Sequence, residues 1–472
     1  MEQEQESKEI RKFVMKTSTI IFLEKMVVLS IMSIFLILVI IAFTDFIPFV
    51  LKFNTSYAST IYQGIGIGSL LSIFAIVISL ALMAVQYASQ QYTHRIMDFY
   101  IKSMMFRCIL FIYMGTIFYN MFMLTEEPVN PTHMFVSISL SALCIVALIP
   151  HFFITMIHLR PDFIIGKMLG RINKKDIDSL KRLPHSEEDK LLLPAAEIIE
   201  RAIRNGDRTT AKNGLDEIRR CYLKYLSPGN EESVSPYFLK HILNVGRVAI
   251  INTDDGSVGY VLNILGKIGT QTVSKKMNSS TKIVLEDIDL IGFKVLQNYD
   301  AATEQMIKSL QDILKAVIES GNEEKEILMQ IFILYNNLSD ELFNLKKDKM
   351  IKFMLTSFSE PRTLLEAMVK NKRCATIEET AKLSKRIGVD AAKGGFIDHF
   401  KQSISLLHEI GTSAAKNKLV WDTPMLEIDI AESTIRRLLA MKREVKDEVE
   451  SKEFNNIMNE IDYAIEDIKR YL

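Results

Sequence analysis

The chain has 472 residues, with 57 Lys and Arg against 57 Asp and Glu, so its formal net charge at pH 7 is zero. This balance does not favour a nucleic-acid partner, because proteins that bind the phosphate backbone carry an excess of cations. The four cysteines show neither metal-ligand spacing nor a disulfide framework. We therefore expect no cofactor and no metal centre.

Four long apolar stretches without Asp, Glu, Lys or Arg occupy the first third of the chain. Each has about 18 residues or more, enough for a helix to cross the hydrocarbon core of a bilayer. They predict a transmembrane domain over residues 26–159, with four spans at about residues 26–46, 64–92, 106–125 and 132–158. The alternative is a set of buried helices in a soluble protein.

The Lys and Arg residues around these stretches are unevenly distributed. Thirteen flank the ends that would share one side of the membrane, and Lys52 alone lies on the other side. By the positive-inside rule, we expect a plasma-membrane protein with both termini in the cytoplasm, and residues 1–25 as a cytoplasmic helix. The thirteen are Lys8, Arg11, Lys12, Lys16, Lys25, Arg95, Lys102, Arg107, Arg160, Lys167, Arg171, Lys174 and Lys175.

The second apolar stretch carries a line of small residues, Gly64, Gly68, Ser72, Ala75 and Ser79, at intervals of three and four. Small residues let another helix approach closely, and they also leave space along the wall of a pore. From the sequence, both a tight helix contact and a pore wall stay open.

The same predicted helix continues into a polar segment that includes Gln86, Gln90 and Arg95. Side-chain amides are costly in hydrocarbon unless they have a partner. These residues predict either a stalk that enters the cytoplasm or a water-filled vestibule below a pore.

Charged side chains are expected only outside the membrane. Proton- or sodium-coupled transporters and voltage sensors place charges at mid-membrane, so the uncharged spans argue against these classes. Asp45, Glu126 and Glu127 fall in the two outer loops. They predict an acidic rim that concentrates cations, with solvated loop carboxylates as the alternative.

The polar exit from the second span has a recognisable pattern: Ser79-Leu80-x4-Val85-Gln86-x-Ala88-Ser89-x-Gln91-x3-Arg95, followed by Phe99. It resembles the signature of a family of uncharacterised prokaryotic membrane proteins, catalogued as a domain of unknown function. The resemblance implies four spans, this polar exit and a cytoplasmic tail, and it implies no activity. A second segment, 226–230, is similar to a family block that continues with Asp-Pro, where this chain has Glu231 and Glu232.

Residues 160–423 have helical periodicity, with an apolar residue followed by glycine recurring along them. Gly246, Gly269 and Gly292 are 23 residues apart, and so are Gly388 and Gly411. A helix of about 17 residues plus a turn fits this unit, so the pattern predicts an all-α cytoplasmic array of stacked helical hairpins. Glycine is unfavourable inside helices, so its recurrence indicates close helix crossings. Chance similarity among helices of equal length is the alternative.

Residues 424–472 are expected to form two further helices. Ile457, Ile461, Ile465, Ile468 and Leu472 share one face of the second helix. This face either caps the array or binds another subunit. Capping is favoured, because the last repeat of an array must cover its apolar surface.

The sequence contains no nucleotide-binding, metalloprotease, serine-hydrolase or thiol-redox motif, so we do not expect an enzyme. It favours an oligomeric ion channel or pore-like protein whose pore lies on a symmetry axis and whose cytoplasmic helices assemble or gate it. The second hypothesis is a membrane-anchored sensor or scaffold whose helical tail binds a cytoplasmic protein. Expected partners are the lipid bilayer, further copies of the chain and, in the second case, that protein.

Overall fold

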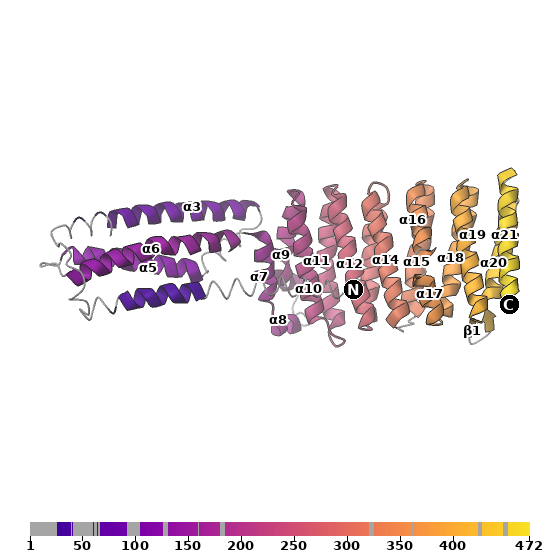
Figure 1. Ribbon diagram of the computed structural model, residues 1–472, viewed down its shortest axis with the longest axis horizontal. Coiled ribbons are helices and arrows are strands. Elements are labelled where there is room, and N and C mark those ends of the chain that lie inside the picture. Colours follow the sequence, from indigo (N-terminus) through magenta and orange to yellow (C-terminus); the bar gives the residue numbers. More distant parts are fainter. Residues whose placement is uncertain are drawn as a thin grey trace. The chain divides into compact units, whose positions relative to one another are not determined.

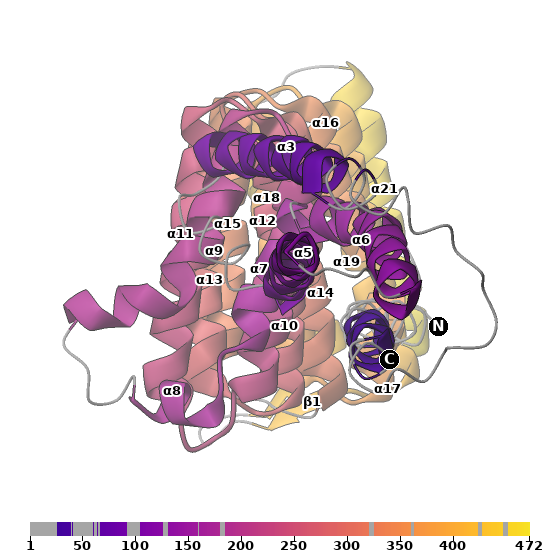
Figure 2. The ribbon, with the colours of Figure 1, turned by 90° about the vertical axis from the view of Figure 1, so that its left-hand side faces the viewer.

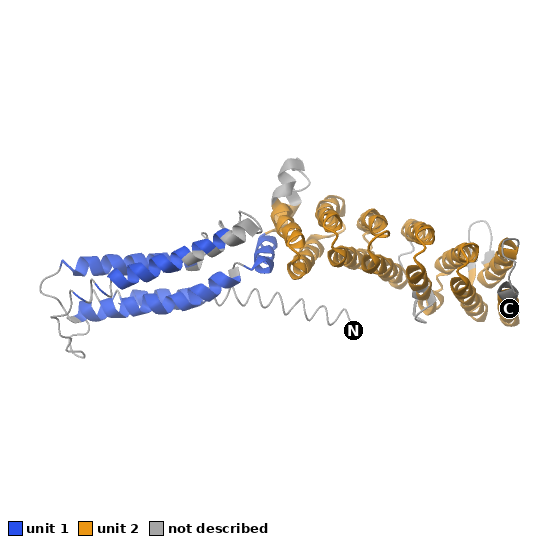
Figure 3. Ribbon diagram, turned by 90° about the horizontal axis from the view of Figure 1, so that it is seen from above, with its two compact units in different colours: residues 1–171 blue, residues 172–472 orange. Residues whose placement is uncertain are grey.

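A computed structural model divides the chain into two units, residues 1–171 and residues 172–472 (Figure 3). The division differs from the expected boundary after residue 159 by one short helix, which belongs to the first unit. The structure describes residues 26–38, 40, 60, 64, 67–91, 104–125, 131–158, 160–179, 185–320, 325–359, 363–422, 427–446 and 452–472.

The first unit consists of apolar helices that run alongside one another (Figure 1). They are Met26–Leu38, α3 (Leu70–Gln91, preceded by a helical turn from Ile67), α5 (Met104–Met123) and α6 (Pro131–His158), followed by the short α7 (Pro161–Gly170).

Two of these helices are long and apolar enough to cross a membrane, α5 over Phe106–Met123 and α6 over Thr132–Ile157. Met26–Leu38 and Ile67–Ser79 are apolar but shorter in the described part of the chain. Residues 41–59 and 92–103, next to these two segments, lie outside the described residues. The structure therefore supports two of the four expected spans.

The second unit is an array of helices, as the periodicity predicted. Its helices are α8 (Lys174–Ser179), α9 (His185–Arg204), α10 (Arg208–Tyr225), α11 (Glu231–Ile251), α12 (Asp255–Ser274), α13 (Asn278–Val295), α14 (Asp300–Ser320), α15 (Lys325–Asn344), α16 (Asp348–Ser359), α17 (Thr363–Lys370), α18 (Cys374–Lys393), α19 (Ile397–Lys416), α20 (Ile430–Lys446) and α21 (Lys452–Tyr471).

These helices stack as antiparallel pairs in two rows, which Figure 3 shows end-on and Figure 2 views along the array. From α9 onward, each helix contacts its chain neighbour and, with α17 left out of the count, the helix two places further on. One row is α9, α11, α13, α15, α18 and α20, and the other is α10, α12, α14, α16, α19 and α21. Six stacked pairs therefore make up the described array, with α17 as an addition between α16 and α18.

Most turns of the array share one backbone conformation. After α12, Lys276 adopts a left-handed φ of 57°. Its N–H donates to Val273 O at 2.9 Å, and the next N–H, of Met277, donates to Thr272 O at 2.9 Å. These two bonds satisfy the carbonyls at the end of the helix and reverse the chain at once. Positive φ angles occur likewise at Gly206, Thr253, Lys346, Lys372, Gly395 and Lys418.

Polar contacts join the turn of one hairpin to the turn of the next, at the same end of the array. Such contacts fix the stacking register of the pairs, while apolar burial provides most of the stability. They are Arg208 Nε to Asp254 Oδ1 at 2.9 Å, Ala302 N to Asp255 Oδ1 at 2.8 Å, and Lys347 Nζ to Asp300 Oδ1 at 2.5 Å.

The recurring glycines lie where helices cross closely, as their spacing predicted. A Cβ added at Gly269 of α12 would lie 2.5 Å from Ile313 Cδ1 of α14 and 3.3 Å from Val284 Cγ1 of α13. Each glycine of this kind thus receives one side chain from the next helix and one from the helix after that. The same pattern holds for Gly246 with Val261 and Ile291, Gly388 with Ser403 and Met441, and Gly411 with Thr434 and Ile468. Gly292 receives Met306 of α14.

The last pair, α20 and α21, closes the array. Ile457, Ile461, Ile465 and Ile468 are buried and only Leu472 of the predicted face is exposed, so capping is the role this face has within one copy. Two three-residue strands, β1 (Val420–Asp422) and β2 (Glu427–Asp429), pair antiparallel before α20. In the part of the chain that the structure describes, the secondary structure is helical as expected, apart from this short ribbon, which the sequence did not predict.

Candidate functional site: the outer face of the membrane helices

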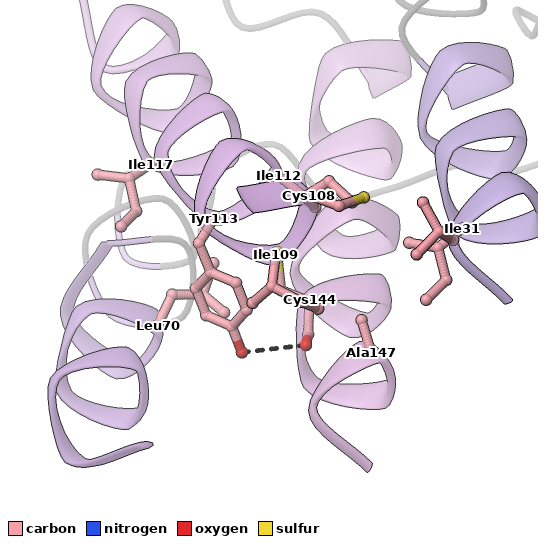
Figure 4. Close-up of a cluster of buried hydrophobic side chains, with 10 residues drawn as sticks. Ile31, Leu70, Cys108, Ile109, Ile112, Tyr113, Ile117, Cys144 and Ala147 are labelled. Atoms are coloured by element: carbon pink, nitrogen blue, oxygen red, sulfur yellow. Dashed lines mark hydrogen bonds between the residues drawn. The ribbon is translucent and has the colours of Figure 1, made fainter. Parts of the chain in front are cut away.

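The apolar core of the first unit is built from all four long helical segments (Figure 4). Ile31 and Leu70 come from the first two segments, and Ile112 and Tyr113 from α5. The Tyr113 hydroxyl donates to the backbone oxygen of Cys144 in α6 at 3.0 Å. The Tyr113 ring also stacks on Phe74 of α3, with ring centroids 4.7 Å apart. Tyr113 thus joins three helices of the unit.

A seam of small polar side chains runs between α5 and α6. Asn120 Nδ2 donates to Thr116 O at 2.8 Å, and the Ser137 hydroxyl donates to Asn120 Oδ1. The Cys144 thiol lies 3.4 Å from the Thr116 hydroxyl. The first of these bonds lies within α5, whereas the bond from Ser137 to Asn120 joins α6 to α5. Between membrane helices a bond of the second kind contributes about 0.6 kcal/mol. The sequence analysis did not identify this seam, although polar residues one turn apart within an apolar helix, as at Thr116 and Asn120, are its signal.

One face of α3 packs against this core. Leu70 and Val85 are buried, and Phe74 is half-buried against Tyr113. These positions recur at intervals of four and eleven, which places them on one side of the helix. The contacts of α3 are with α5 and α6.

The line of small residues predicted as a pore wall or helix contact lies on the opposite side of α3. We call Gly64, Gly68, Ser72, Ala75 and Ser79 the small-residue face, and all five are exposed. The Ser72 hydroxyl donates to the oxygen of Gly68 at 2.8 Å, so it is satisfied within its own helix. No described atom lies within 4 Å of a Cβ built at Gly64. Within one copy of the chain, the described helices therefore leave this face uncovered.

The polar continuation follows the same line. Gln86 lies seven residues after Ser79, hence on the same side of α3, and it is exposed. Gln90 belongs to α3. Arg95, and the acidic residues Asp45, Glu126 and Glu127, lie outside the described residues. The structure thus brings the small-residue face and Gln86 into one outward line.

The outward surfaces of α5 and α6 have a different character. They expose large apolar side chains, including Phe111, Phe118, Phe122, Ile149 and Phe153, each more than half exposed. Such side chains suit contact with lipid tails. On α3, Leu71, Ile76 and Met83 stand exposed on either side of the small-residue face. That face is therefore a shallow strip between larger residues, the geometry that accepts a second helix.

The described part of the array includes a strongly perturbed acid. Asp287 of α13 is buried, and its Oδ2 has no hydrogen-bond partner among the described residues. Burial raises its pKa from 3.8 to about 7; Glu286 adds to the rise and Arg247 of α11 opposes it. Among the described residues, no group of three His, Cys, Asp or Glu side chains is placed to hold a metal ion.

The outer surface of the array includes an apolar patch on two neighbouring helices. Leu290 of α13 and Met329 and Ile333 of α15 are each about half exposed. Lys282 pairs with Glu326 at 2.6 Å, which sets the register of α13 against α15. Leu290 is eight residues after Lys282 and Ile333 is seven residues after Glu326, so the two side chains lie at about the same height along the neighbouring helices. We call Leu290, Met329 and Ile333 the array patch.

Comparisons with known proteins bear on the first unit and the start of the array. No curated protein matches the chain. Among solved structures, a circular tandem repeat protein with a novel repeat topology is similar at 12% identity and a TM-score of 0.38, over 85% of this chain and 97% of its own. Residues 17–223 match the model of a family described as a predicted membrane protein (DUF2254). The resemblance carried by the Gln86 to Arg95 segment is thereby confirmed, since this segment lies within the residues that match the family model.

Proposed function

We propose that this chain is the subunit of an oligomeric, channel-like membrane protein that crosses the bilayer four times with both termini in the cytoplasm. In this proposal, copies meet through the small-residue face of α3, the pore lies on the symmetry axis, and the helical array assembles or gates it. The observation that carries the proposal is the outward line from Gly64 to Gln86 on a helix of a membrane protein.

Two physical arguments support an occupant other than lipid on this line. A glycine or serine surface offers lipid tails few atoms to contact, whereas it lets a helix backbone approach closely. An outward amide such as Gln86 is costly in hydrocarbon and is satisfied by water or by a neighbouring polar group. Both arguments favour a second copy, with water at the Gln86 end.

Cysteine scanning of α3 tests the proposal. In a chain whose native cysteines are replaced by Ser, single cysteines are placed at Gly68, Ser72, Ser79 and Gln86, with Ile149 and Phe153 of α6 as lipid-facing controls. We expect cross-links between copies at the α3 positions, labelling by a membrane-impermeant thiol reagent at Ser79 and Gln86, and neither at the α6 controls. Conductance of the reconstituted protein is measured in parallel.

The results separate the parts of the proposal. Cross-linking without aqueous labelling or conductance would leave an oligomer that is not a channel. A monomer that is electrically silent and uniformly protected along α3 would refute the proposal altogether.

A membrane-anchored scaffold is the second candidate function, and the array patch favours it. Leu290, Met329 and Ile333 form an apolar surface on a unit whose other outward residues are largely polar. Helical arrays bind partners through such extended surfaces. If the full chain retains a protein in stoichiometric amount and Met329→Ser/Ile333→Ser releases it while α3 variants do not, the scaffold function is favoured over the channel.

A further inference from the structure

Helix α7 follows α6, the later of the two described helices long enough to cross a membrane, almost without a linker. The apolar part of α6 ends at Ile157 and α6 itself at His158, and α7 begins at Pro161. The chain can advance about 10 Å at most over these three steps. The headgroup layer on each side of a bilayer is about 5–7 Å thick. The start of α7 is therefore held at the level of the lipid headgroups when α6 spans the membrane.

The helix α7 is a packed element rather than a segment that inserts into lipid. Its apolar side chains Phe163, Ile164, Ile165, Met168 and Leu169 are all buried within the protein. Arg160 at its N-terminal boundary has an extended backbone, and proline at the first helical position fixes the start of the helix. The surface that α7 offers to its surroundings is consequently its polar one.

That polar surface carries three cations in line. Arg160, Lys167 and Arg171 are separated by seven and four residues, which places them on one side of α7. Arg160 and Arg171 are exposed and Lys167 is half-buried, with its Nζ 5.6 Å from the centre of the Phe163 ring. We call these three residues the cation face.

The cation face has hydrogen-bonding capacity for a phosphate. Arg160 donates from Nε and from Nη2 to the Asp162 carboxylate, at 3.3 and 2.9 Å. A guanidinium has five N–H donors, so this pair uses two of them. The Arg160 side chain is 61% exposed, and an ion pair so exposed contributes little and yields readily to another anion.

We propose that the cation face of α7 is a binding site for the phosphates of anionic phospholipid headgroups, since Arg160 and Arg171 lie too far apart along the helix to bind one phosphate together. Phosphate is the shared chemistry of a lipid headgroup and a free anion, and the position of α7 at the end of α6 selects the lipid. Arg160 and Arg171 provide guanidinium forks suited to phosphate oxygens, and Lys167 adds a third positive charge between them. This site is independent of the α3 contact proposed above.

Native mass spectrometry of the full chain in detergent tests the site, with phosphatidylglycerol and phosphatidylcholine as probes. The wild type should retain phosphatidylglycerol at concentrations at which phosphatidylcholine is lost, and salt at about 1 M should weaken this retention. One cation near a headgroup layer raises the affinity about fivefold, so three cations together raise it about a hundredfold. Arg160→Gln/Lys167→Gln/Arg171→Gln should therefore bind phosphatidylglycerol about a hundredfold more weakly.

Two further variants isolate the cause. Arg160→Lys/Lys167→Arg/Arg171→Lys keeps the charge and should restore retention. Lys308→Gln/Lys349→Gln/Lys352→Gln changes the charge equally at exposed positions of α14 and α16 and should bind as the wild type does.

Three results would overturn the proposal. They are equal retention of both lipids by the wild type, undiminished retention by the triple glutamine variant, and displacement of phosphatidylglycerol by inorganic phosphate alone at matched concentration. The first and third are measured on the wild type, so the proposal is tested even if a variant does not fold.

Discussion

Replacing Asp287 by Asn tests how the array responds to a buried acid. The folded chain raises the pKa of this carboxyl from 3.8 to about 7, because burial disfavours the charged form. The folded state therefore binds its proton more tightly than the unfolded state. Stability falls as the pH rises from about 4 to about 7 and is constant above that range. The difference between the two pKa values corresponds to about 4 kcal/mol.

Asparagine has the shape of the acid and no charge at any pH. At low pH we expect the stability of Asp287→Asn to differ from that of the wild type only by a constant amount, which reflects the burial of the asparagine amide. The free energy of unfolding of Asp287→Asn should then rise by about 4 kcal/mol relative to that of the wild type as the pH rises from about 4 to about 8. For a unit of this size, that gain corresponds to about 6 °C in the temperature of unfolding.

The assay is thermal unfolding of the full chain in detergent, followed by circular dichroism across this pH range. Hydrogen exchange of peptides from α11 and α13 shows whether the effect is local. Asp254 is the matched control: burial alone would raise its pKa, but hydrogen bonds from Ser257 and the charge of Arg208 outweigh this, and its pKa is lowered. Asp254→Asn should thus lose stability at neutral pH. A pH-independent difference between Asp287→Asn and the wild type would refute the reasoning.

Three further substitutions test packing and backbone arguments by the same unfolding measurement. Gly266→Ala should destabilise the array by about 1–2 kcal/mol, because the new Cβ would lie 2.7 Å from Ser309 Cβ and 3.1 Å from its Cα. Its control is Gly259→Ala in the same helix, where the new Cβ would have no described atom nearer than 4.0 Å. This substitution should stabilise the array by about 1 kcal/mol. Equal effects at the two glycines would contradict the close crossing. Lys276→Gly should stabilise by about 1 kcal/mol by relieving the left-handed backbone, whereas Lys275→Gly, where φ is −91°, should not. Asn120→Leu should weaken the α5–α6 pair by about 0.6 kcal/mol, because it removes the bond from Ser137. Phe122→Leu, on the exposed side of α5, should leave the pair unchanged.

The features that the sequence predicted well are those set by local chemistry. Apolar stretches in the first third identified the helices of the first unit, since backbone groups in lipid must bond within a helix. The 23-residue glycine spacing predicted close crossings, and Gly246, Gly269, Gly388 and Gly411 all lie at such crossings. The burial of Ile457, Ile461, Ile465 and Ile468 agrees with the same physics, because an exposed apolar face at the end of an array is unfavourable.

Other features depend on which face of a helix meets its neighbours, and periodicity alone does not determine that. Leu70 and Ser72 are two residues apart on α3, yet one is buried and the other exposed. The sequence predicted the line of small residues and left both roles open, since a packed face and an outward face have the same spacing. Asp287 was not distinguished from the other acids, because its burial depends on how the helices pack and not on the local sequence. The left-handed turns at Lys276 and Lys346 were not predicted either, because these positions carry lysine and not glycine, the residue that indicates a left-handed backbone.

The two membrane-level proposals use different surfaces of the first unit, and this makes them separable. The small-residue face lies on α3, whereas the cation face lies on α7, which follows α6. If lipid binding were only a consequence of oligomer formation, a bulky substitution such as Gly68→Leu would abolish both. If each surface acts by its own chemistry, Gly68→Leu removes the cross-links and keeps the phosphatidylglycerol adducts, and the triple glutamine variant of α7 does the reverse. The second pattern is the one that the outward glycines and the exposed guanidinium groups lead us to expect, because close backbone packing and phosphate binding share no contacting atom.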